Sequence, residues 1–336
     1  MKEKPSNLDT KLCAAVVIGR NEGQRLINCI ESLKPDIQHI VYVDSGSTDN
    51  SLQEAKNRNV NCISLDLNKP FTAARARNEG AKYLFEAYPD IGFIQFIDGD
   101  CEVQPDWIDE AYKFLLDNDD YAVACGRRRE RFPKQSVYNQ LCDIEWNTPI
   151  GDAKSCGGDA LIRVSAFTQI AGYNSSLIAG EEPEMCFRLR DNGWKVVRLD
   201  SEMTLHDAAM FRVGQWWNRA KRAGFAYAQG YSIHGRSTDK YNYKPTISIL
   251  LWGGFIPLSV ILLSLLIEPL FLLLFVCYPL QIFRLSIKNI SNNMTLKNAV
   301  SYAISNVCGK FPQFIGVLRF AKSHLLGRQS SLIEYK

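Results

Sequence analysis

The 336-residue sequence lacks several features that mark common classes of protein. It has no long run of Lys and Arg, and its formal net charge is only +3, so we expect no nucleic-acid partner. Its ten cysteines form no Cys-x-x-Cys pair and show no regular spacing. We therefore predict neither a zinc site nor a disulfide framework, but reduced thiols in a cytosolic compartment.

An export signal is also missing near the amino terminus. Met1–Lys11 is polar and charged, and the apolar run that follows it, Cys13–Ile18, is shorter than the core of a signal peptide. We therefore expect that this part of the chain is not exported.

One long apolar stretch is present in the second half of the sequence. Between Lys244 and Arg284 the only charged residue is Glu268. Ile247–Ile267 has the roughly 20 apolar residues that one membrane span needs, and Leu270–Phe283 is marginal. We predict a transmembrane helical hairpin with its turn at Glu268, or alternatively one span followed by an interfacial or re-entrant segment.

Basic residues flank this stretch on both sides. Lys240 and Lys244 precede it, and Arg284 and Lys288 follow it, which predicts that both flanks lie on the cytoplasmic face of a membrane such as a bacterial inner membrane. Two amphipathic helices after the hairpin would lie on the membrane surface or dock on the folded domain. The predicted segments are a soluble domain at 1–240, the hairpin at 245–285 and the amphipathic helices at 286–336.

The first hundred residues alternate between apolar strands and amphipathic helices. We predict strands at Cys13–Ile18, Ile40–Val43, Cys62–Leu65 and Phe93–Ile97, with a helix at Phe71–Phe85 between the third and the fourth. This alternation predicts an α/β fold with a mostly parallel sheet and helices on both faces. Many nucleotide-binding domains have this architecture.

Two carboxylates follow the fourth strand directly. Asp98 and Asp100 are separated only by Gly99, so they lie where a parallel sheet binds its ligands, outside the carboxyl end of a strand. Their oxygens suit a divalent cation that also holds phosphate oxygens. The alternative is an ordinary Asp-Gly turn.

Further polar residues suggest chemistry in the second half of the soluble part. Glu181 and Glu182 precede Pro183, which we predict to be the first residue of a helix; a carboxylate there is either a general base or an ordinary acidic first turn. Arg219 and Arg222 lie in a basic, aromatic segment just before the membrane. An interfacial aromatic belt would explain its tryptophans, and a clamp on a diphosphate leaving group would explain the arginines.

Five short motifs occur in an order that resembles the family 2 glycosyltransferases, whose catalytic domain has the GT-A fold. The resemblance covers about residues 12–230, and each motif is weak by itself. The motifs are Val16–Glu22, Val43–Asp49, Ala76–Gly80, Asp98–Asp100 and Gly180–Arg190.

The resemblance implies a donor site for a nucleotide-diphosphate sugar. It implies that Asp98, Asp100 and His206 hold Mg²⁺ or Mn²⁺, although a lone histidine such as His206 is more often structural. The residues that it implies around the nucleoside are Arg20, Glu22, Asp44, Arg77 and Asp98.

The resemblance also implies direct displacement with inversion at the sugar. Glu182 takes the place of the catalytic carboxylate of the family, which is usually the Asp of a Glu-Asp pair, so the choice between Glu181 and Glu182 stays open. Arg219 and Arg222 would neutralise the departing diphosphate, and we predict Gly158 and Asp159 on the acceptor side.

The hairpin makes a membrane-bound, lipid-linked glycan acceptor plausible, as in polysaccharide or glycolipid assembly. The Gln-x-x-Arg-Trp motif of processive synthases is absent, so we expect one sugar to be added per encounter. Three alternatives stay open: a polyprenyl-phosphate sugar synthase, a nucleotidyltransferase, and a non-catalytic membrane partner in a polysaccharide-assembly complex.

Overall fold

A computed structural model describes residues 12–69 and 72–327. Contacts between residues divide this part of the chain into two units, which we describe separately. The first unit contains the described residues up to Phe132 together with Cys142–Leu177 and Glu181–Ala208. The second contains Pro133–Leu141, Ile178–Gly180 and the described residues from Ala209 onward.

A single sheet forms the centre of the first unit. Its strand order is β3-β2-β1-β4-β8-β6-β9-β5, with β7 paired to β9. The strands are β1 (Cys13–Gly19), β2 (His39–Asp44), β3 (Asn61–Ser64), β4 (Phe93–Asp98), β5 (Cys101–Val103), β6 (Tyr121–Glu130), β7 (Gly151–Asp152), β8 (Ala160–Arg163) and β9 (Lys195–His206).

The four strands predicted from the sequence form the parallel part of this sheet. β1 pairs in parallel with β2 and with β4, and β2 pairs in parallel with β3. The register places Gly19 opposite Asp44 and Ile18 opposite Asp98. The polar residues that follow these strands therefore lie at one edge of the sheet, as expected for a parallel arrangement.

The rest of the sheet is mixed, which the sequence did not predict. β8 lies antiparallel between β4 and β6, and β5 lies antiparallel to β9. β6 continues to Glu130 and lies in parallel with β9. The prediction of a mostly parallel sheet is confirmed, because β6 and β9 run in the same direction as β1 to β4, whereas β5, β7 and β8 run in the opposite direction.

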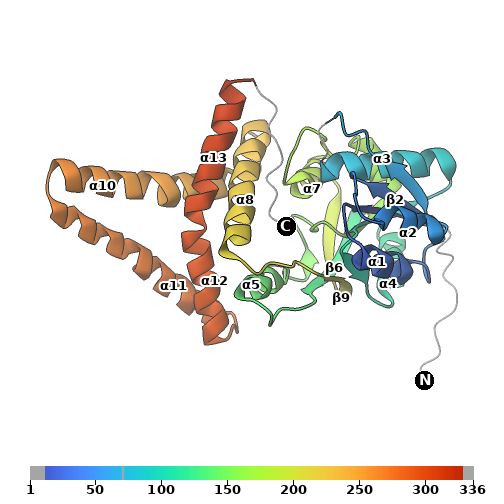
Figure 1. Ribbon diagram of the computed structural model, residues 1–336, viewed down its shortest axis with the longest axis horizontal. Coiled ribbons are helices and arrows are strands. Elements are labelled where there is room, and N and C mark those ends of the chain that lie inside the picture. The colour runs from blue at the N-terminus through green and yellow to red at the C-terminus, as the bar shows by residue number, and fades with distance from the viewer. Residues whose placement is uncertain (1–11, 70–71, 328–336) are drawn as a thin grey trace. The chain divides into compact units, whose positions relative to one another are not determined.

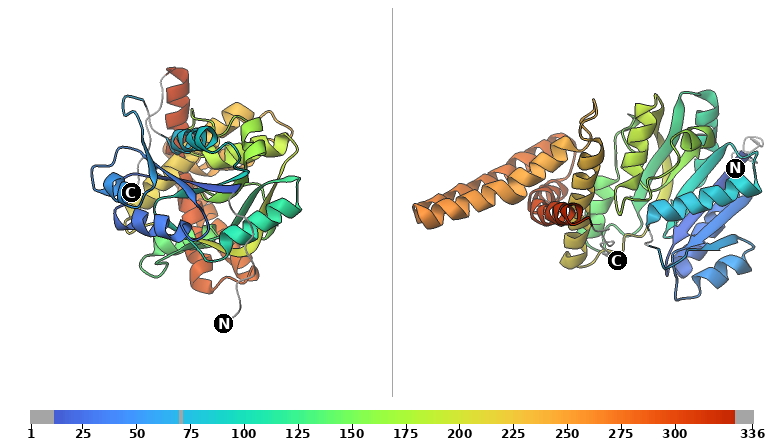
Figure 2. Two further views of the ribbon diagram at one scale, coloured as in Figure 1. Left: turned by 90° about the vertical axis from the view of Figure 1, so that its right-hand side faces the viewer. Right: turned by 90° about the horizontal axis from the view of Figure 1, so that it is seen from above.

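Helices cover both faces of the parallel part, as predicted. α3 lies on one face, and α1 and α4 lie on the other (Figures 1 and 2). Gly80 allows the close approach of α3 to β1, since a Cβ there would lie 2.5 Å from Val16 Cγ1. The helices with residues in this unit are α1 (Gln24–Leu33), α2 (Ser51–Asn57), α3 (Ala73–Ala87), α4 (Trp107–Asp117), α5 (Val137–Glu145, shared with the second unit), α6 (Val164–Gln169) and α7 (Glu181–Asp191).

Two helix starts differ from the predictions. α3 begins at Ala73, capped by the Thr72 side chain, and the predicted start at Phe71 lies outside the described residues. α7 begins at Glu181, so the prediction that Pro183 is its first residue is wrong. A proline is tolerated at the third position because the first backbone N–H groups of a helix have no intrahelical acceptor.

The second unit is helical. Its helices are α8 (Val213–His234), α9 (Tyr243–Ile249), the π-helical turn η2 (Leu250–Phe255), α10 (Ile256–Leu266), the 3₁₀ segment η3 (Pro269–Val276), α11 (Cys277–Ser291), α12 (Leu296–Cys308) and α13 (Lys310–Leu325). α9, η2 and α10 form one continuous helix, and η3 and α11 form another. The chain reverses between them at Glu268, as predicted.

Glycines allow the backbones of this unit to pack closely. A Cβ on Gly224 of α8 would lie 2.0 Å from the carbonyl oxygen of Gln313 in α13. A Cβ on Gly253 of η2 would lie 2.2 Å from the carbonyl oxygen of Lys310. α13 therefore contacts α8 and η2 at positions where no larger residue fits, a common way for helices to associate in membranes.

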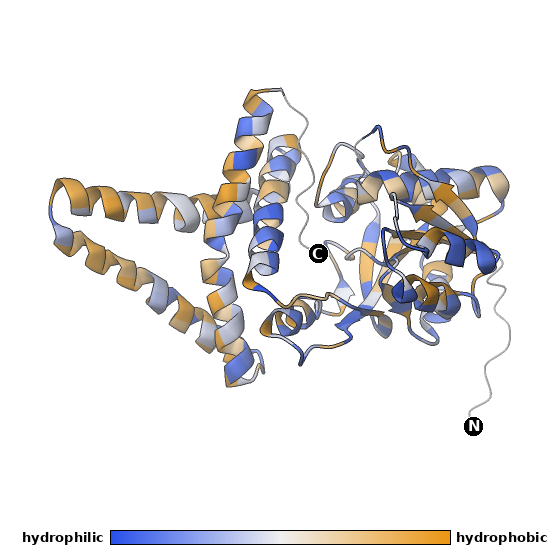
Figure 3. Cartoon of the chain, in the orientation of Figure 1, coloured by the Kyte–Doolittle hydropathy of each residue, from blue (hydrophilic) through white to orange (hydrophobic). Residues whose placement is uncertain are grey.

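Two helices of the second unit are long and apolar enough to cross a membrane. Tyr243–Leu266 and Pro269–Ser291 have mean hydropathies of 2.3 and 2.0. Figure 3 shows apolar residues around both helices over most of their length. Most of their large apolar side chains are exposed, unlike those of a core helix in a soluble protein.

Candidate active site

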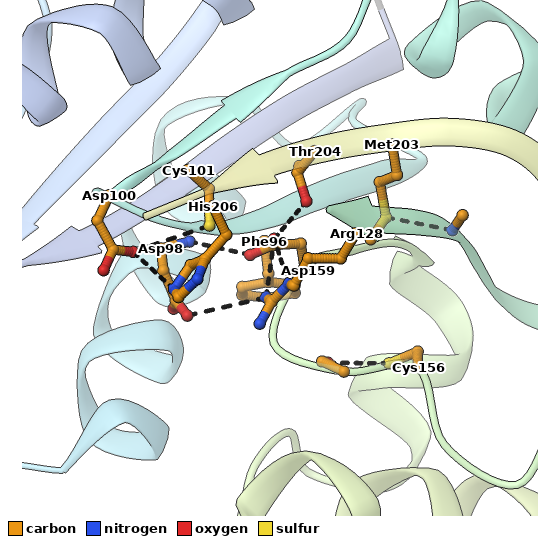
Figure 4. A network of polar contacts seen from close by, with 12 residues as sticks. Phe96, Asp98, Asp100, Cys101, Arg128, Cys156, Asp159, Met203, Thr204 and His206 are labelled. Carbon is orange, nitrogen blue, oxygen red and sulfur yellow. Dashed lines mark hydrogen bonds and ion pairs between the residues drawn. The ribbon is translucent and has the colours of Figure 1, made fainter. Parts of the chain in front are cut away.

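The two aspartates of the Asp-Gly-Asp motif follow β4 at the polar edge of the sheet. Gly99 between them donates its N–H to the carbonyl oxygen of Ile18, at 2.8 Å. A Cβ on Gly99 would lie 3.2 Å from that oxygen, so glycine suits this close approach to the end of β1. The turn directs Asp98 and Asp100 to different partners, as Figure 4 shows.

Asp98 faces a buried arginine of α3. Arg77 Nη2 lies 2.7 Å from Asp98 Oδ1, and Arg77 Nη1 lies 3.0 Å from Glu181 Oε1. Burial lowers the pKa of the Arg77 guanidinium, but the charge of Asp98 and other nearby groups outweighs this and raises it. Arg77 therefore stays charged and connects the end of β4 to the start of α7.

A second arginine and a buried aspartate support Asp98 from the other side. Arg128 lies on β6, and its Nη2 is 2.7 Å from Asp159 Oδ2. The hydroxyl of Thr204 donates a hydrogen bond to the same oxygen, at 2.8 Å. Asp159 Oδ1 accepts the backbone N–H of Asp98, at 3.2 Å. Burial raises the pKa of Asp159, but Arg128 and the other partners outweigh it and lower the pKa, so this carboxylate is ionised inside the protein.

Gly158 lies within this group of charges. A Cβ there would be 2.9 Å from Arg128 Nη2, 3.0 Å from Asp98 Oδ2 and 3.3 Å from the guanidinium of Arg77. The two residues predicted on the acceptor side thus have different surroundings. Gly158 is closely surrounded by charged side chains, whereas Asp159 is completely buried and accepts the backbone N–H of Asp98.

Asp100 lies beside His206, where the antiparallel pair of β5 and β9 places Cys101 opposite His206. His206 Nε2 is 3.3 Å from Asp100 Oδ1, and Asp100, Cys101 and His206 form a cluster that could hold a metal ion. Asp98, the third predicted ligand, is not part of this cluster.

The surroundings of His206 fit a divalent cation. Its Nδ1 is buried and has no hydrogen-bond partner in the part of the chain that the structure describes. The Trp146 ring packs edge-on against the imidazole, with centroids 4.6 Å apart. The 3.3 Å between Asp100 Oδ1 and His206 Nε2 is close to the roughly 3 Å that separates neighbouring ligands of one cation bound at about 2.1 Å.

The residues predicted around the nucleoside lie at the ends of β1 and β2. Asp44 is buried, and its Oδ2 accepts the backbone N–H groups of Gly46 and Ser47 at 3.1 and 3.0 Å, so it shapes the loop after β2. Glu22 pairs with Arg25 at 2.8 Å, and Arg20 is exposed.

Asn21, which the sequence analysis did not single out, joins the two loops. It has a positive φ of 57°, and its Oδ1 accepts the N–H of Thr48 at 2.7 Å. Its own N–H donates to Ser47 Oγ at 2.9 Å. Asn tolerates this left-handed conformation better than most residues, which is the signal that could have identified it.

Glu181 and Glu182 point to different partners at the start of α7. Glu181 contacts Arg77, while Glu182 Oε1 accepts the backbone N–H of Cys156 and the thiol of Cys186, the latter at 3.2 Å. Burial raises the pKa of Glu182, and its hydrogen bonds only partly oppose that effect. The two cysteines were not predicted, because nothing in their spacing indicates that they meet, with sulfur atoms 3.6 Å apart.

Arg219 and Arg222 lie on α8, in the second unit. Their predicted contact with a diphosphate joins residues of different units, and it stays a prediction. The predicted domain boundaries at 240 and 285 stay predictions too.

The arrangement of strands and polar residues defines a class of fold. A polar edge follows β1, β2 and β4, with an acidic motif after β4 and a histidine at the end of β9, as fits the GT-A fold. Residues 15–168 match the model of Glycosyl transferase family 2, and this part of the chain is a domain of that family. The match supports glycosyltransfer as the chemistry of this domain.

Solved structures resemble the chain in fold. A mannosyltransferase from Pyrobaculum calidifontis, in complex with GDP-Man and Mn²⁺, superposes with a TM-score of 0.58 at 13% identity, over 90% of this chain and 86% of that one. Glucosyl-3-phosphoglycerate synthase from Mycobacterium tuberculosis, in complex with Mn²⁺, UDP and glucosyl-3-phosphoglycerate, gives a TM-score of 0.43 at 15% identity, over 65% of this chain and 79% of that one. No curated protein matches the sequence.

Proposed function

We propose that this protein transfers one sugar from a nucleotide-diphosphate sugar to a hydroxyl of a membrane-bound, lipid-linked acceptor, with inversion at the sugar. One observation carries the proposal: Asp98 and Glu181 share Arg77, and Asp100 lies beside His206, in a family 2 domain whose chain continues into two exposed apolar helices.

The donor would bind at the polar edge of the sheet. Asp100 and His206 would hold Mg²⁺ or Mn²⁺, with Asp98 as a third ligand or as the partner of Arg77. When bound, the cation supplies a positive charge that neutralises the diphosphate. The Mn²⁺ in the mannosyltransferase structure supports a cation in this fold. The nucleoside would lie against Arg20, Glu22 and Asp44, and we assign the diphosphate to Arg219 and Arg222.

The transfer step needs one proton acceptor. The acceptor oxygen forms a bond to the anomeric carbon while the bond from that carbon to the phosphate oxygen breaks, and the nucleotide diphosphate leaves with the electron pair. We assign the acceptor proton to Glu182, whose raised pKa makes its ionised form a stronger base than an ordinary glutamate. The leaving diphosphate needs no proton, so one carboxylate is sufficient.

Glu181 is the alternative base, and its partners suggest a different contribution. Because Arg77 binds both Glu181 and Asp98, the Glu181 side chain helps to fix the donor-side carboxylate. Asp159 would act in the same way, since it holds the backbone N–H of Asp98 and the side chain of Arg128. We assign the acceptor to the side of Gly158.

The membrane part supports an acceptor that is itself in the membrane. The Lys and Arg residues on both flanks of the hairpin favour the cytoplasmic face for the catalytic domain. A domain held there reaches a soluble nucleotide sugar and a lipid-linked acceptor together. We expect addition of one sugar per encounter.

The test is a transfer assay on the full-length protein in detergent. Nucleotide sugars with radioactive sugars are offered one by one, with Mn²⁺ or chelator, together with a membrane lipid extract. We expect one donor to label the organic phase only with the cation present. Cleavage of that donor without labelled lipid would contradict the lipid-linked acceptor, and no turnover of any donor would contradict catalysis.

Acceptor chemistry separates the two transferase alternatives. A purified polyprenyl phosphate and a lipid-linked sugar with a free hydroxyl are compared as acceptors. We expect the label on the lipid-linked sugar and its loss in Glu182→Gln. Label on the polyprenyl phosphate alone would identify a polyprenyl-phosphate sugar synthase instead.

A further inference from the structure

The second unit has a large excess of positive charge. Residues 209–336 contain fifteen Lys and Arg but only three Asp and Glu, which are Asp239, Glu268 and Glu334. Most cations of this region therefore cannot be neutralised by acids of the same region. An excess of positive charge in one region favours the binding of anions there.

Two of these cations line one pocket. The pocket has a volume of about 450 Å³ and lies between the two apolar helices where they meet α12 and the start of α13. Lys288 of α11 and Lys310 of α13 reach it, together with the amide side chains of Asn289 and Asn292. No acidic side chain lines the pocket in the described part of the chain.

The charge of Lys310 is destabilised by partial burial. Lys310 is partly buried at the start of α13, and burial lowers the pKa of its ammonium group, with no acidic neighbour among the described residues to oppose the effect. A desolvated cation without a counter-ion is unfavourable. Because an anion in the pocket would relieve this cost, the pocket is suited to bind one.

Apolar surfaces lead away from the pocket. The helices Tyr243–Leu266 and Pro269–Ser291 diverge at this end and approach one another at the hairpin turn (Figure 1). Their sides are apolar and exposed, with 60% of Leu258, 60% of Leu280 and 64% of Phe283 accessible. At about 1.5 Å per residue each helix is roughly as long as the hydrocarbon core of a bilayer is thick.

We propose that this pocket binds the phosphate of an anionic lipid, with Lys288 and Lys310 as its charged ligands and the lipid tails along the exposed helices. A soluble phosphate would match the cations but not the apolar walls, and a neutral lipid would match the walls but not the cations. The inference requires the hairpin to lie in a bilayer, but it does not depend on the transfer reaction.

The site is tested on the full-length protein in detergent, by thermal unfolding with added lipid. Phosphatidylglycerol should raise the unfolding temperature of the wild type by about 4 °C at saturation. The double variant Lys288→Met, Lys310→Met should lose most of this shift. Lys322→Met is the matched control, because Lys322 is an exposed lysine on the same helix as Lys310, and this variant should keep the shift.

Other ligands distinguish the sources of phosphate. Protection by a polyprenyl phosphate as well as phosphatidylglycerol would support a lipid-phosphate site and widen its range of lipids. Equal protection by phosphatidylcholine or by inorganic phosphate would overturn the proposal, and so would an undiminished shift in the double variant.

Native mass spectrometry provides a second readout that does not depend on the stability of the variants. The wild type and Lys322→Met should retain one anionic lipid more than the double variant. Equal retention by all three proteins would overturn the proposal, even if the double variant unfolds at a different temperature.

Discussion

The two regions of this chain have opposite net charges. Residues 1–208 contain 24 Lys and Arg against 33 Asp and Glu, whereas residues 209–336 contain 15 against 3. The first region neutralises its buried charges internally, as in the pairs of Arg77 with Asp98 and Arg128 with Asp159. In the second, Lys310 has no acidic neighbour within the described part of the chain that would stabilise its charge.

This difference indicates where each region obtains its specificity. Buried pairs fix side chains in one geometry, which a site for transfer chemistry requires. Cations without internal partners attract anions from outside, which a region at a membrane surface requires. Disrupting the first region should therefore affect catalysis and donor binding, and disrupting the second should affect membrane association and stability.

The largest expected effect comes from the proposed base. Glu182→Gln keeps the shape of the side chain but removes the proton acceptor, so kcat should fall about 10²- to 10⁴-fold. The affinity for the nucleotide should stay nearly unchanged. Glu181→Gln is the matched variant, and it should weaken donor binding as well, because Glu181 pairs with Arg77 beside Asp98.

Steady-state kinetics and nucleotide binding, measured on both variants, check this assignment. If Glu182→Gln lost donor affinity by the same factor as turnover, Glu182 would be a binding residue and the base assignment would be wrong.

The next largest effect is expected when a substitution removes the buried ion pairs of the first region. Arg77→Met leaves Asp98 and Glu181 without their shared cation, and the free energy of unfolding should fall by about 3 kcal/mol. Denaturant unfolding gives the loss, and hydrogen exchange at β1 and β4 shows where it arises. Lys82→Met, at an exposed position of the same helix, should change stability by less than about 0.5 kcal/mol. Equal stability of the two variants would show that the Arg77 pairs are dispensable.

A smaller effect is expected from a substitution that disturbs helix packing in the second region only. Gly224→Ala would place a methyl group 2.0 Å from the carbonyl oxygen of Gln313 and should separate α8 from α13, at a cost of about 1–3 kcal/mol. Gly214→Ala on the same helix has no atom within 4 Å of the new Cβ, and it should stabilise by about 0.5–1 kcal/mol. Thermal unfolding compares the two variants, and nucleotide binding should be the same in both. A comparable stability for both would contradict the close packing.

The smallest effect concerns pH. A general base must be ionised, so the rate falls as the pH drops below its pKa. Because burial raises the pKa of Glu182 above the ordinary 4.5, the acid limb of kcat should lie at a higher pH than an ordinary glutamate would give. A pH profile of kcat at saturating donor and cation measures it. An acid limb at or below 4.5 would argue against Glu182 as the base.

The ends of the strands made much of the site predictable. Asp44 and Asp98 follow apolar runs, and the parallel register of β1, β2 and β4 brings them to one edge. The apolar stretch likewise predicted two long helices with a turn at Glu268.

Contacts between distant strands were not predictable from local patterns. The insertion of β8 between β4 and β6 brings Asp159 to Arg128 and to the backbone of Asp98. Local sequence patterns do not predict this order of strands. The contact of Cys156 with Cys186 arises in the same way, from two segments that are 30 residues apart. The residues to which we assign the chemistry could be named from the sequence, while the contacts that hold them in place needed the fold.

The central claim is that Asp100 and His206 form a cation-dependent donor site. Calorimetric titration of the detergent-solubilised protein with a panel of nucleoside diphosphates, with Mn²⁺ and with chelator, tests it most directly. The account predicts that one nucleotide binds only with the cation, that Asp100→Ala abolishes this binding, and that Asp200→Ala, at an exposed acid of β9, preserves it. Equal binding with chelator, or undiminished binding in Asp100→Ala, would contradict the account.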